Sequence, residues 1–231
     1  MEKKISVVIP CFNCSDTIIK TWDSLKKQTI GIDNLECVFV DDASSDDGHT
    51  WMILEQIESE CPDSVMIIHL DKNMRQGGAR NVGITYATSE YLMFLDSDDE
   101  FVDNACEIAY GCIKNTDSDI VQFNHVYRLG NRTRVTNESD SNGVYVISGH
   151  DDRIKFLNSS LVTYGCTNKI YRLELIRQVK AVFAERAVYE EPLFVYPCFL
   201  YANKVSLITD ALYIYNIVKF SRFFTKNVKI P

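Results

Sequence analysis

Tyr91-Leu-Met-Phe-Leu-Asp96-Ser97-Asp98-Asp99-Glu100 joins an apolar run directly to a cluster of acids. Five apolar residues in a row, bounded by polar segments, predict a strand that is buried on both faces of a parallel sheet. Asp96 and Asp98 then lie where that strand ends, which is the edge at which open α/β sheets bind ligands. Such a pair of carboxylates suits a divalent cation that also takes phosphate oxygens. The alternative is a helix N-cap formed by Ser97, Asp98 or Asp99.

Strand-like and helix-like segments alternate through the part of the chain that leads to this stretch. The predicted strands cover residues 5–9, 36–40, 65–70 and 91–95, and the predicted helices begin at Ser15 or Asp16, cover 48–60 and lie within 73–89. Strands separated by helices imply right-handed crossovers. The sequence therefore predicts an α/β fold with a Rossmann-like, mostly parallel sheet and helices on both faces.

The pattern is less regular beyond Asp98. Helices are predicted over 102–114, 150–160, 168–178 and 189–201, strands over 119–127, 205–208 and 212–217, and a hairpin turn or loop over 128–143. No internal repeat or linker divides the chain. We therefore expect residues 1–100 and 101–231 to form two parts of one continuous domain.

Composition narrows the class of partner. The formal net charge of −8 disfavours general nucleic-acid binding. Residues 213–231 carry four cations and no acid, which predicts either a peripheral contact with an anionic membrane or polyanionic acceptor, or a solvated terminal element. The start of the chain does not match a signal peptide, and no stretch approaches the length of a membrane-spanning helix.

The eight cysteines mostly lie within apolar runs, which is typical of reduced thiols. We therefore expect a cytoplasmic chain, peripheral at the inner face of the membrane if the basic segment binds lipid. Cys11 and Cys14 match a redox or half-zinc spacing, but no second pair of that spacing accompanies them. The sequence leaves the oligomeric state open, a homodimer included.

Polar or acidic clusters follow three of the predicted strands, at residues 10–16, 41–47 and 96–99. Because the carboxyl ends of parallel strands share one edge, we expect these clusters to converge. Two unscreened carboxylates repel each other by roughly 4 kcal/mol at about 4 Å, so a cation or a donor-rich ligand is expected there. The turn at residues 10–16 contains no glycine and no basic residue, so it matches neither a dinucleotide-binding loop nor a P-loop.

Four motifs run through residues 4–102. They are Ser6-Val-Val-Ile-Pro-Cys-Phe-Asn13, Val40-Asp-Asp-Ala-Ser-Ser-Asp-Asp-Gly48, Asn73-x3-Gly-Gly-Ala-Arg80-Asn-x-Gly83 and Tyr91-Leu-Met-Phe-Leu-Asp-Ser-Asp-Asp99. In this order and spacing they strongly resemble the family 2 glycosyltransferases of GT-A fold. A weaker likeness continues through Asn168-Lys-Ile-Tyr-Arg172 and Val188-Tyr-Glu-Glu-Pro192. The resemblance implies an inverting, hexosyltransferase-type enzyme that uses a nucleotide sugar.

The resemblance also implies how the nucleoside is held. Asp42, with Asp41 beside it, is expected to accept a hydrogen bond from the N3–H of a uracil-like base. Pro10 and Phe12 are expected to shape the floor below the base and ribose. Arg80 is expected near the diphosphate, because a guanidinium fits anionic oxygens.

Asp96-Ser97-Asp98 matches the DxD motif of the family. The resemblance implies that Asp98 binds Mn²⁺ or Mg²⁺ bridging the two phosphates, while Asp96, next to Ser97, holds the ribose or the metal through water. Such a metal stabilises the leaving nucleoside diphosphate.

An inverting transfer also needs a general base for the acceptor hydroxyl. Glu191 stands where the family has an Asp, with Glu190 before it, and the longer side chain is a departure from the family pattern. Glu185 is an alternative base. The other interpretation is that these acids simply begin a helix.

The sequence thus predicts a metal-dependent transfer from a UDP-sugar to a glycan or lipid-linked hydroxyl in polysaccharide or glycolipid synthesis of the cell envelope. The chain lacks the Q-x-x-R-W motif of processive synthases, which favours the transfer of a single sugar. Two rival hypotheses are a nucleotidyltransferase and a catalytically impaired nucleotide-sugar binding subunit.

Overall fold

The computed structural model describes residues 2–136 and 140–217. Its strands are β1 (Ile5–Cys11), β2 (Leu35–Asp41), β3 (Val65–His69), β4 (Tyr91–Phe94), β5 (Glu100–Phe101), β6 (Ile120–Leu129), β7 (Arg132–Val135), β8 (Gly143–Val146), β9 (Lys169–Arg172) and β10 (Lys204–Asn216). Its helices are α1 (Ile18–Lys26), α2 (His49–Glu60), α3 (Arg75–Tyr86), α4 (Ala105–Thr116), α5 (Gly149–Leu157), α6 (Leu173–Val179) and α7 (Glu191–Tyr201), with a short 3₁₀ turn at Ile32–Asn34.

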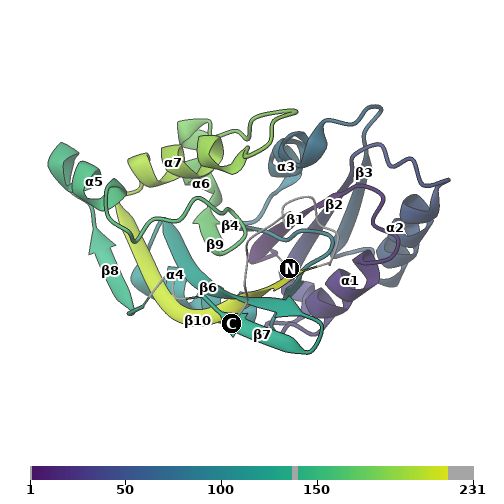
Figure 1. Ribbon diagram of the computed structural model, residues 1–231, viewed down its shortest axis with the longest axis horizontal. Coiled ribbons are helices and arrows are strands. Elements are labelled where there is room, and N and C mark those ends of the chain that lie inside the picture. The colour runs from purple at the N-terminus through teal and green to yellow at the C-terminus, as the bar shows by residue number, and fades with distance from the viewer. Residues whose placement is uncertain (1, 137–139, 218–231) are drawn as a thin grey trace.

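One mixed sheet runs through the molecule, in the order β3-β2-β1-β4-β9-β6-β10-β5, with β7 beside β6 and β8 beside β10 (Figure 1). Strands β3, β2, β1 and β4 are parallel neighbours, as the alternating pattern predicted. Strand β9 pairs antiparallel with both β4 and β6, so it joins the parallel strands β1–β4 to the later strands.

Helices cover both faces of the sheet, as predicted. Ile5, Val7 and Ile9 of β1 point into one core, which also receives apolar residues of α1, α2 and α4. Val8 points into a second core, which receives residues of α3, α5, α6 and α7. Because successive strand residues face opposite sides, a strand between two cores needs apolar residues on both faces, and that explains the nearly continuous apolar runs in the sequence.

The predicted helix over 168–178 is wrong in its first half, because Lys169–Arg172 is strand β9 and only Leu173–Val179 is helical. Ile170 lies in the first core and Tyr171 in the second, so this short segment is buried on both faces like the central strands. A short apolar run carries no periodicity that separates a buried strand from a buried helix. The two predicted closing strands are one strand, β10, whose pairing with β6 shifts register near Ala211.

Three further predictions concern a hairpin, the cysteines and contact with a membrane. The hairpin expected after Arg128 is confirmed, since β6 and β7 pair antiparallel across Gly130. All eight cysteines are free. In the described residues, no helix is long and apolar enough to span a membrane, and the basic cluster at 219–229 lies outside them.

Helix α3 packs very closely on β1, so we expect Gly83→Ala to destabilise the fold. An added Cβ at Gly83 would stand 2.3 Å from Cγ1 of Val8, a fully buried side chain. Overpacking of this kind costs about 1–3 kcal/mol, measurable as a lower free energy of unfolding in urea. Gly111 of α4 is the matched control, because its Cβ would meet nothing within 4 Å, and alanine there should stabilise the helix by about 0.5–1 kcal/mol. Equal stability of the two variants would contradict this packing.

Candidate active site

The carboxyl ends of β2, β1 and β4 lie next to one another, and we call this line of strand ends the acidic edge. Cys11 pairs with Asp41 at the end of β1 and β2, and the N–H of Asp42 donates to the carbonyl oxygen of Cys11 at 2.8 Å. On the other side of β1, the N–H of Leu95 donates to the carbonyl oxygen of Val8 at 3.1 Å. The predicted convergence of the three polar clusters is therefore confirmed.

Asp41 is tied into the fold by both carboxylate oxygens. Its Oδ1 accepts hydrogen bonds from the N–H and the hydroxyl of Ser44, and its Oδ2 lies 2.7 Å from Nδ1 of His69. Only 1% of Asp41 is exposed. This carboxylate therefore holds the loop after β2 against the end of β3. Its expected contact with a uracil-like base stays a prediction.

Asp42 lies against the start of α3. Its Oδ1 accepts the N–H of Met74 at 2.6 Å, and its carbonyl oxygen accepts Nδ2 of Asn73 at 3.1 Å. Burial raises the pKa of Asp42, against the opposing effect of the Met74 N–H, and the neighbouring charge of Asp41 adds to the increase. The side chain is thus held in one position at the acidic edge.

Pro10 and Phe12 lie between the two acidic clusters. Pro10 is buried within β1, whereas the Phe12 ring is 46% exposed and open to a flat ligand. Asn13, which the sequence analysis left without a role, has a positive φ of 49° and binds the neighbouring loop. Its Oδ1 accepts the N–H of Ser45 at 2.7 Å, which joins the loops after β1 and β2.

Asp98 is the exposed carboxylate of the DxD motif. Partial burial and, second, the adjacent charge of Asp96 raise its pKa to about 6, because both disfavour the charged carboxylate. In the described residues, no Lys or Arg forms an ion pair with Asp98, whereas Arg80 pairs with Asp96. Ser97 lies between them and is half-buried.

These two carboxylates fit a divalent cation of the Mg²⁺ or Mn²⁺ type. Among the described residues, no group of three His, Cys, Asp or Glu side chains is arranged to hold a metal ion. A site with one or two carboxylates leaves room for water and phosphate oxygens, which is how Mg²⁺ is held beside nucleotides. The residues present therefore suit a metal that arrives with a diphosphate.

The alternative of a helix N-cap at Ser97, Asp98 or Asp99 is wrong, because β5 follows directly and α4 begins only at Ala105; Asp99 is instead a structural anchor. Its Oδ2 accepts the Tyr213 hydroxyl at 2.6 Å, and its Oδ1 accepts the N–H of Asn216 at 2.7 Å. Burial raises the pKa of Asp99, and the charges of Asp96 and Asp98 add to the increase. Asp99 therefore fastens the end of β10 to the acidic edge.

Arg80 lies inside the protein, between two acids. Its Nη2 donates to Oδ1 of Asp96 at 2.6 Å, and its Nη1 donates to Oε1 of Glu190 at 2.8 Å. Only 1% of Arg80 is exposed, and its guanidinium lies 5.3 Å from the centre of the Phe183 ring. The structure thus brings Glu190, from the distant second half, to the acidic edge.

Glu190 and Glu191 are adjacent in the chain but differ in surroundings. Glu190 is 2% exposed and also accepts Nε2 of Gln76. Glu191 is half-buried at the start of α7, and its Oε1 accepts the N–H of Cys166 at 2.7 Å. Glu185, the alternative base, is exposed in the segment before α7.

Lys169 supports the loop that contacts Glu191. It is fully buried on β9, and its Nζ donates to Oγ1 of Thr163 and Oδ1 of Asn168, both at 2.8 Å. Arg172 lies at the opposite end of β4 from the DxD motif, opposite Tyr91. It pairs there with Glu90 and Asp117, among others.

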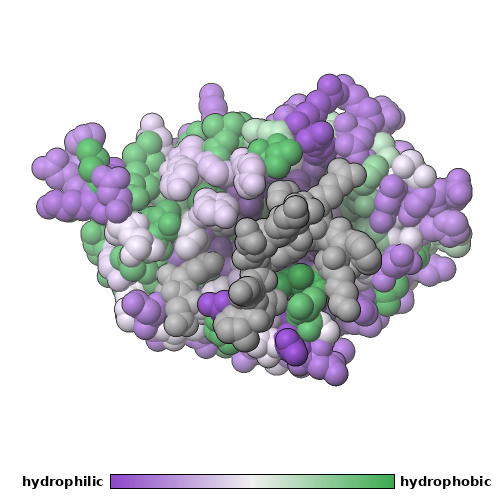
Figure 2. All heavy atoms as spheres, viewed as in Figure 1, coloured by the Kyte–Doolittle hydropathy of each residue, from purple (hydrophilic) through white to green (hydrophobic). Residues whose placement is uncertain are grey.

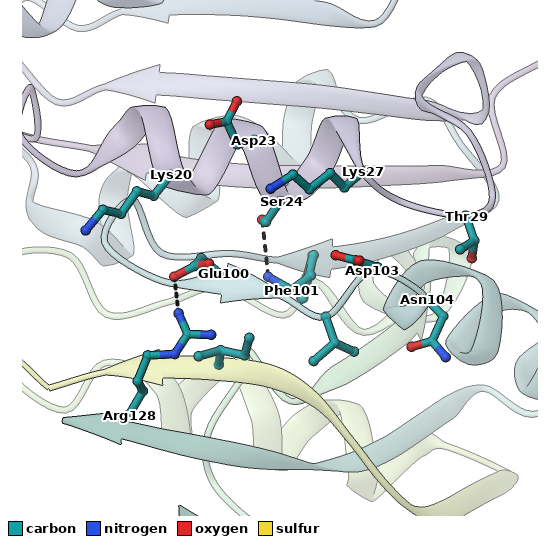
Figure 3. A pocket seen from close by; sticks show the side chains of 12 residues that line it. Lys20, Asp23, Ser24, Lys27, Thr29, Glu100, Phe101, Asp103, Asn104 and Arg128 are labelled. Atoms are coloured by element: carbon teal, nitrogen blue, oxygen red, sulfur yellow. Dashed lines mark hydrogen bonds and ion pairs between the residues drawn. The ribbon is translucent and has the colours of Figure 1, made fainter. Parts of the chain in front are cut away.

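A separate cavity of about 600 Å³ lies between α1, β5 and the strands β6 and β10 (Figure 3). Its lining includes the cations Lys20, Lys27 and Arg128 and the acids Asp23, Glu100 and Asp103, and Arg128 is paired with Glu100. None of the predicted site residues lines this cavity. Its cations and acids balance, so its lining favours no particular ligand charge.

Comparisons with known proteins match this geometry. The family model described as glycosyl transferase family 2 matches residues 6–180. The glycosyltransferase GlyG of Streptococcus pneumoniae serotype 4 is 27% identical over 230 residues, which cover 93% of this chain and 71% of that protein. The poly(ribitol-phosphate) beta-glucosyltransferase of Bacillus spizizenii is 29% identical over 213 residues, which cover 92% of this chain and 32% of that enzyme.

Among solved structures, residues 1–349 of Staphylococcus aureus TarS in complex with UDP-GlcNAc align with a TM-score of 0.82 and 27% identity. The alignment covers 97% of this chain and 62% of the TarS chain. This likeness confirms the GT-A fold that the motifs predicted. The chain spans about a third of the Bacillus relative and less than two thirds of the TarS structure, yet the family model covers most of it. The chain therefore belongs to glycosyl transferase family 2.

Proposed function

We propose that this chain is a metal-dependent, inverting glycosyltransferase that moves a sugar from a UDP-sugar to a hydroxyl acceptor in polysaccharide or glycolipid synthesis. One observation carries the proposal. Asp42, Asp96 and Asp98 meet at the acidic edge, and a buried arginine ties the Glu190–Glu191 pair to that edge. The TarS structure that aligns with this chain contains UDP-GlcNAc, which supports a UDP-linked donor.

In this proposal the donor lies along the acidic edge. Asp42 accepts a hydrogen bond from the uracil base of the donor, and the exposed Phe12 ring lies below this base and its ribose. Asp98 and Asp96 would hold Mn²⁺ or Mg²⁺, which when bound would stabilise the leaving diphosphate as a Lewis acid. Residues 1–100 then supply the donor site, and residues 101–231 supply the general base and the acceptor side.

Glu191 is the general base in this proposal. Its carboxylate takes the proton of the acceptor hydroxyl while the hydroxyl oxygen forms a bond to the anomeric carbon of the sugar. The bond from that carbon to the phosphate oxygen breaks, and UDP leaves with the electron pair. The hydrogen bond from Cys166 fixes one oxygen of Glu191, which restricts the direction in which the carboxylate points.

The surface beside Glu191 favours a glycan or lipid-linked acceptor. Helix α7 begins at Glu191, and its outward side chains Leu193, Tyr196, Leu200 and Tyr201 are exposed. Figure 2 shows hydrophobic residues near the place of α7 in Figure 1. An apolar surface next to the base suits an acceptor with a lipid portion, because contiguous exposed apolar side chains mark interaction sites. A peripheral membrane contact and a homodimer remain predictions.

The proposal is tested by measuring UDP release from a panel of UDP-sugars with Mn²⁺, with and without a poly(ribitol phosphate) or lipid-linked saccharide acceptor. We expect acceptor-dependent UDP release from at least one donor. UDP-sugar binding without turnover by the intact chain would instead support the binding-subunit hypothesis. Release of pyrophosphate from a nucleoside triphosphate and a sugar phosphate would support the nucleotidyltransferase hypothesis.

A further inference from the structure

One side of α3 makes close contacts with the segment that leads to Glu191, the proposed general base. Asn81 makes two hydrogen bonds with the backbone of Phe183, one to its carbonyl oxygen at 3.0 Å and one from its N–H at 2.8 Å. An added Cβ at Gly77 would stand 2.6 Å from the carbonyl oxygen of Ala184 and 3.0 Å from Cγ of Glu190. The Gly-Gly-Ala-Arg-Asn motif therefore lies directly against Phe183, Ala184 and Glu190.

Arg80 is the centre of this contact. Its two terminal nitrogens are directed to different carboxylates, Nη2 to Asp96 of the DxD motif and Nη1 to Glu190. A guanidinium is a rigid planar fork, so two bonds in fixed directions set the separation of the two acids. The Phe183 ring against the guanidinium leaves it 1% exposed.

This geometry differs from that of a phosphate ligand. A side chain that binds a diphosphate directs its terminal donors to the phosphate oxygens, whereas both terminal nitrogens of Arg80 already donate to acids of the chain. Glu190 is the residue directly before Glu191 and is itself 2% exposed. Whatever holds the Glu190 carboxylate therefore also holds the backbone that carries Glu191.

We propose that Arg80 is a positioning residue that fixes Glu191 relative to the donor, by joining Asp96 to Glu190, and that it does not bind the diphosphate directly. The inference rests on the proposed function, in which Glu191 is the base. Loss of the Arg80–Glu190 bond then moves the base without removing any group that touches the donor. A misplacement of about 1 Å can lower the rate of a reaction by about 100-fold.

The test compares Arg80→Met, Glu190→Gln and the double variant for kcat, for KM of the donor and for the dissociation constant of UDP with Mn²⁺. We expect each single variant to lower kcat by about 10–100-fold, with UDP affinity within about threefold of wild type. The kcat of the double variant should be no lower than that of the less active single variant, because both substitutions remove the same connection. Arg80→Met with kcat retained and UDP affinity reduced about tenfold or more would overturn the inference, as would additive losses.

A second readout does not depend on sugar transfer. Hydrogen exchange of the amides in residues 181–191 should become faster in Arg80→Met and in Glu190→Gln, since both release this segment from α3. Arg172→Met is the matched control, because Arg172 also pairs with carboxylates but lies at the far end of β4. It should leave exchange in 181–191 and the kinetic constants unchanged.

The two readouts separate the inference from the proposed function. Wild-type chain that releases no UDP from any donor would refute the proposed function, while the exchange rates would still test the hold of Arg80 on this segment. If Arg80→Met does not fold, Glu190→Gln keeps the test, because it nearly preserves the shape of the side chain. Unchanged exchange and unchanged kcat in Glu190→Gln would overturn the inference.

Discussion

Replacing Glu191 with glutamine is expected to lower kcat for sugar transfer by about 10²–10⁴-fold, which is the usual contribution of a general base. The amide cannot take the proton of the acceptor hydroxyl. Its oxygen can still accept the N–H of Cys166, which now donates to Glu191 at 2.7 Å, so the start of α7 should be preserved. The measurement is steady-state UDP release with saturating donor and acceptor, together with the dissociation constant of UDP, which should stay near wild type.

Glu185→Gln is the matched control for this prediction. Glu185 lies in the same segment, is exposed, and is the alternative base that the sequence allows. It should retain wild-type kcat if Glu191 is the base. Full transfer by Glu191→Gln together with a large loss in Glu185→Gln would exchange the two roles.

Replacing Asp98 with asparagine is expected to lower transfer by about 10²–10³-fold, equivalent to about 3–4 kcal/mol of activation free energy. Asparagine has nearly the same volume but carries no charge, so it loses most of its attraction for a divalent cation. Burial and, second, the neighbouring charge of Asp96 raise the pKa of Asp98 to about 6, and a bound cation would favour the charged form. Excess EDTA should have a similar effect on wild-type chain, and added Mn²⁺ should reverse it.

Asp103→Asn controls for the general loss of a negative charge near this stretch. Asp103 is exposed, lies five residues further along the chain, and lines the separate cavity. It should leave both the rate and its dependence on Mn²⁺ unchanged. Full activity of Asp98→Asn, or of wild-type chain in EDTA, would show that the transfer needs no metal at this site.

The acidic edge was predictable because its signals are local. Each strand is a largely apolar run, the acids stand at or just after its carboxyl end, and parallel strands bring their carboxyl ends together. Asp42 and Asp98 are therefore found at the edge where the sequence put them. Glu191 begins α7, as the paired acids there indicated.

The sequence could not reveal connections between distant residues. Arg80 and Glu190 are 110 positions apart, and Asp99 and Tyr213 are 114 apart, so no spacing rule relates them. Likewise, the antiparallel entry of β9 between β4 and β6 depends on tertiary pairing and leaves no periodic signal in four residues. These long-range contacts determine which acids are buried inside the protein, and the sequence alone did not indicate them.

Adjacent acids show the same limit. Asp41 and Asp42 look alike in the sequence, yet the Asp41 carboxylate is bound on both oxygens by Ser44 and His69. Only the surrounding fold distinguishes a side chain that shapes a loop from one that is held at the edge. The same holds for Glu190 and Glu191, of which the first is buried against Arg80.

The most direct test of the central claim, that the acidic edge binds a nucleoside diphosphate together with a metal, is the thermal unfolding midpoint of wild-type chain with UDP and Mn²⁺. A ligand at about 100 times its dissociation constant stabilises the native state by about 2.7 kcal/mol, which for a chain of this size raises the midpoint by about 5–10 °C. We expect that increase with UDP and Mn²⁺ together, and a much smaller one in Asp98→Asn. An unchanged midpoint with UDP and with GDP, with Mn²⁺ present, would contradict the claim.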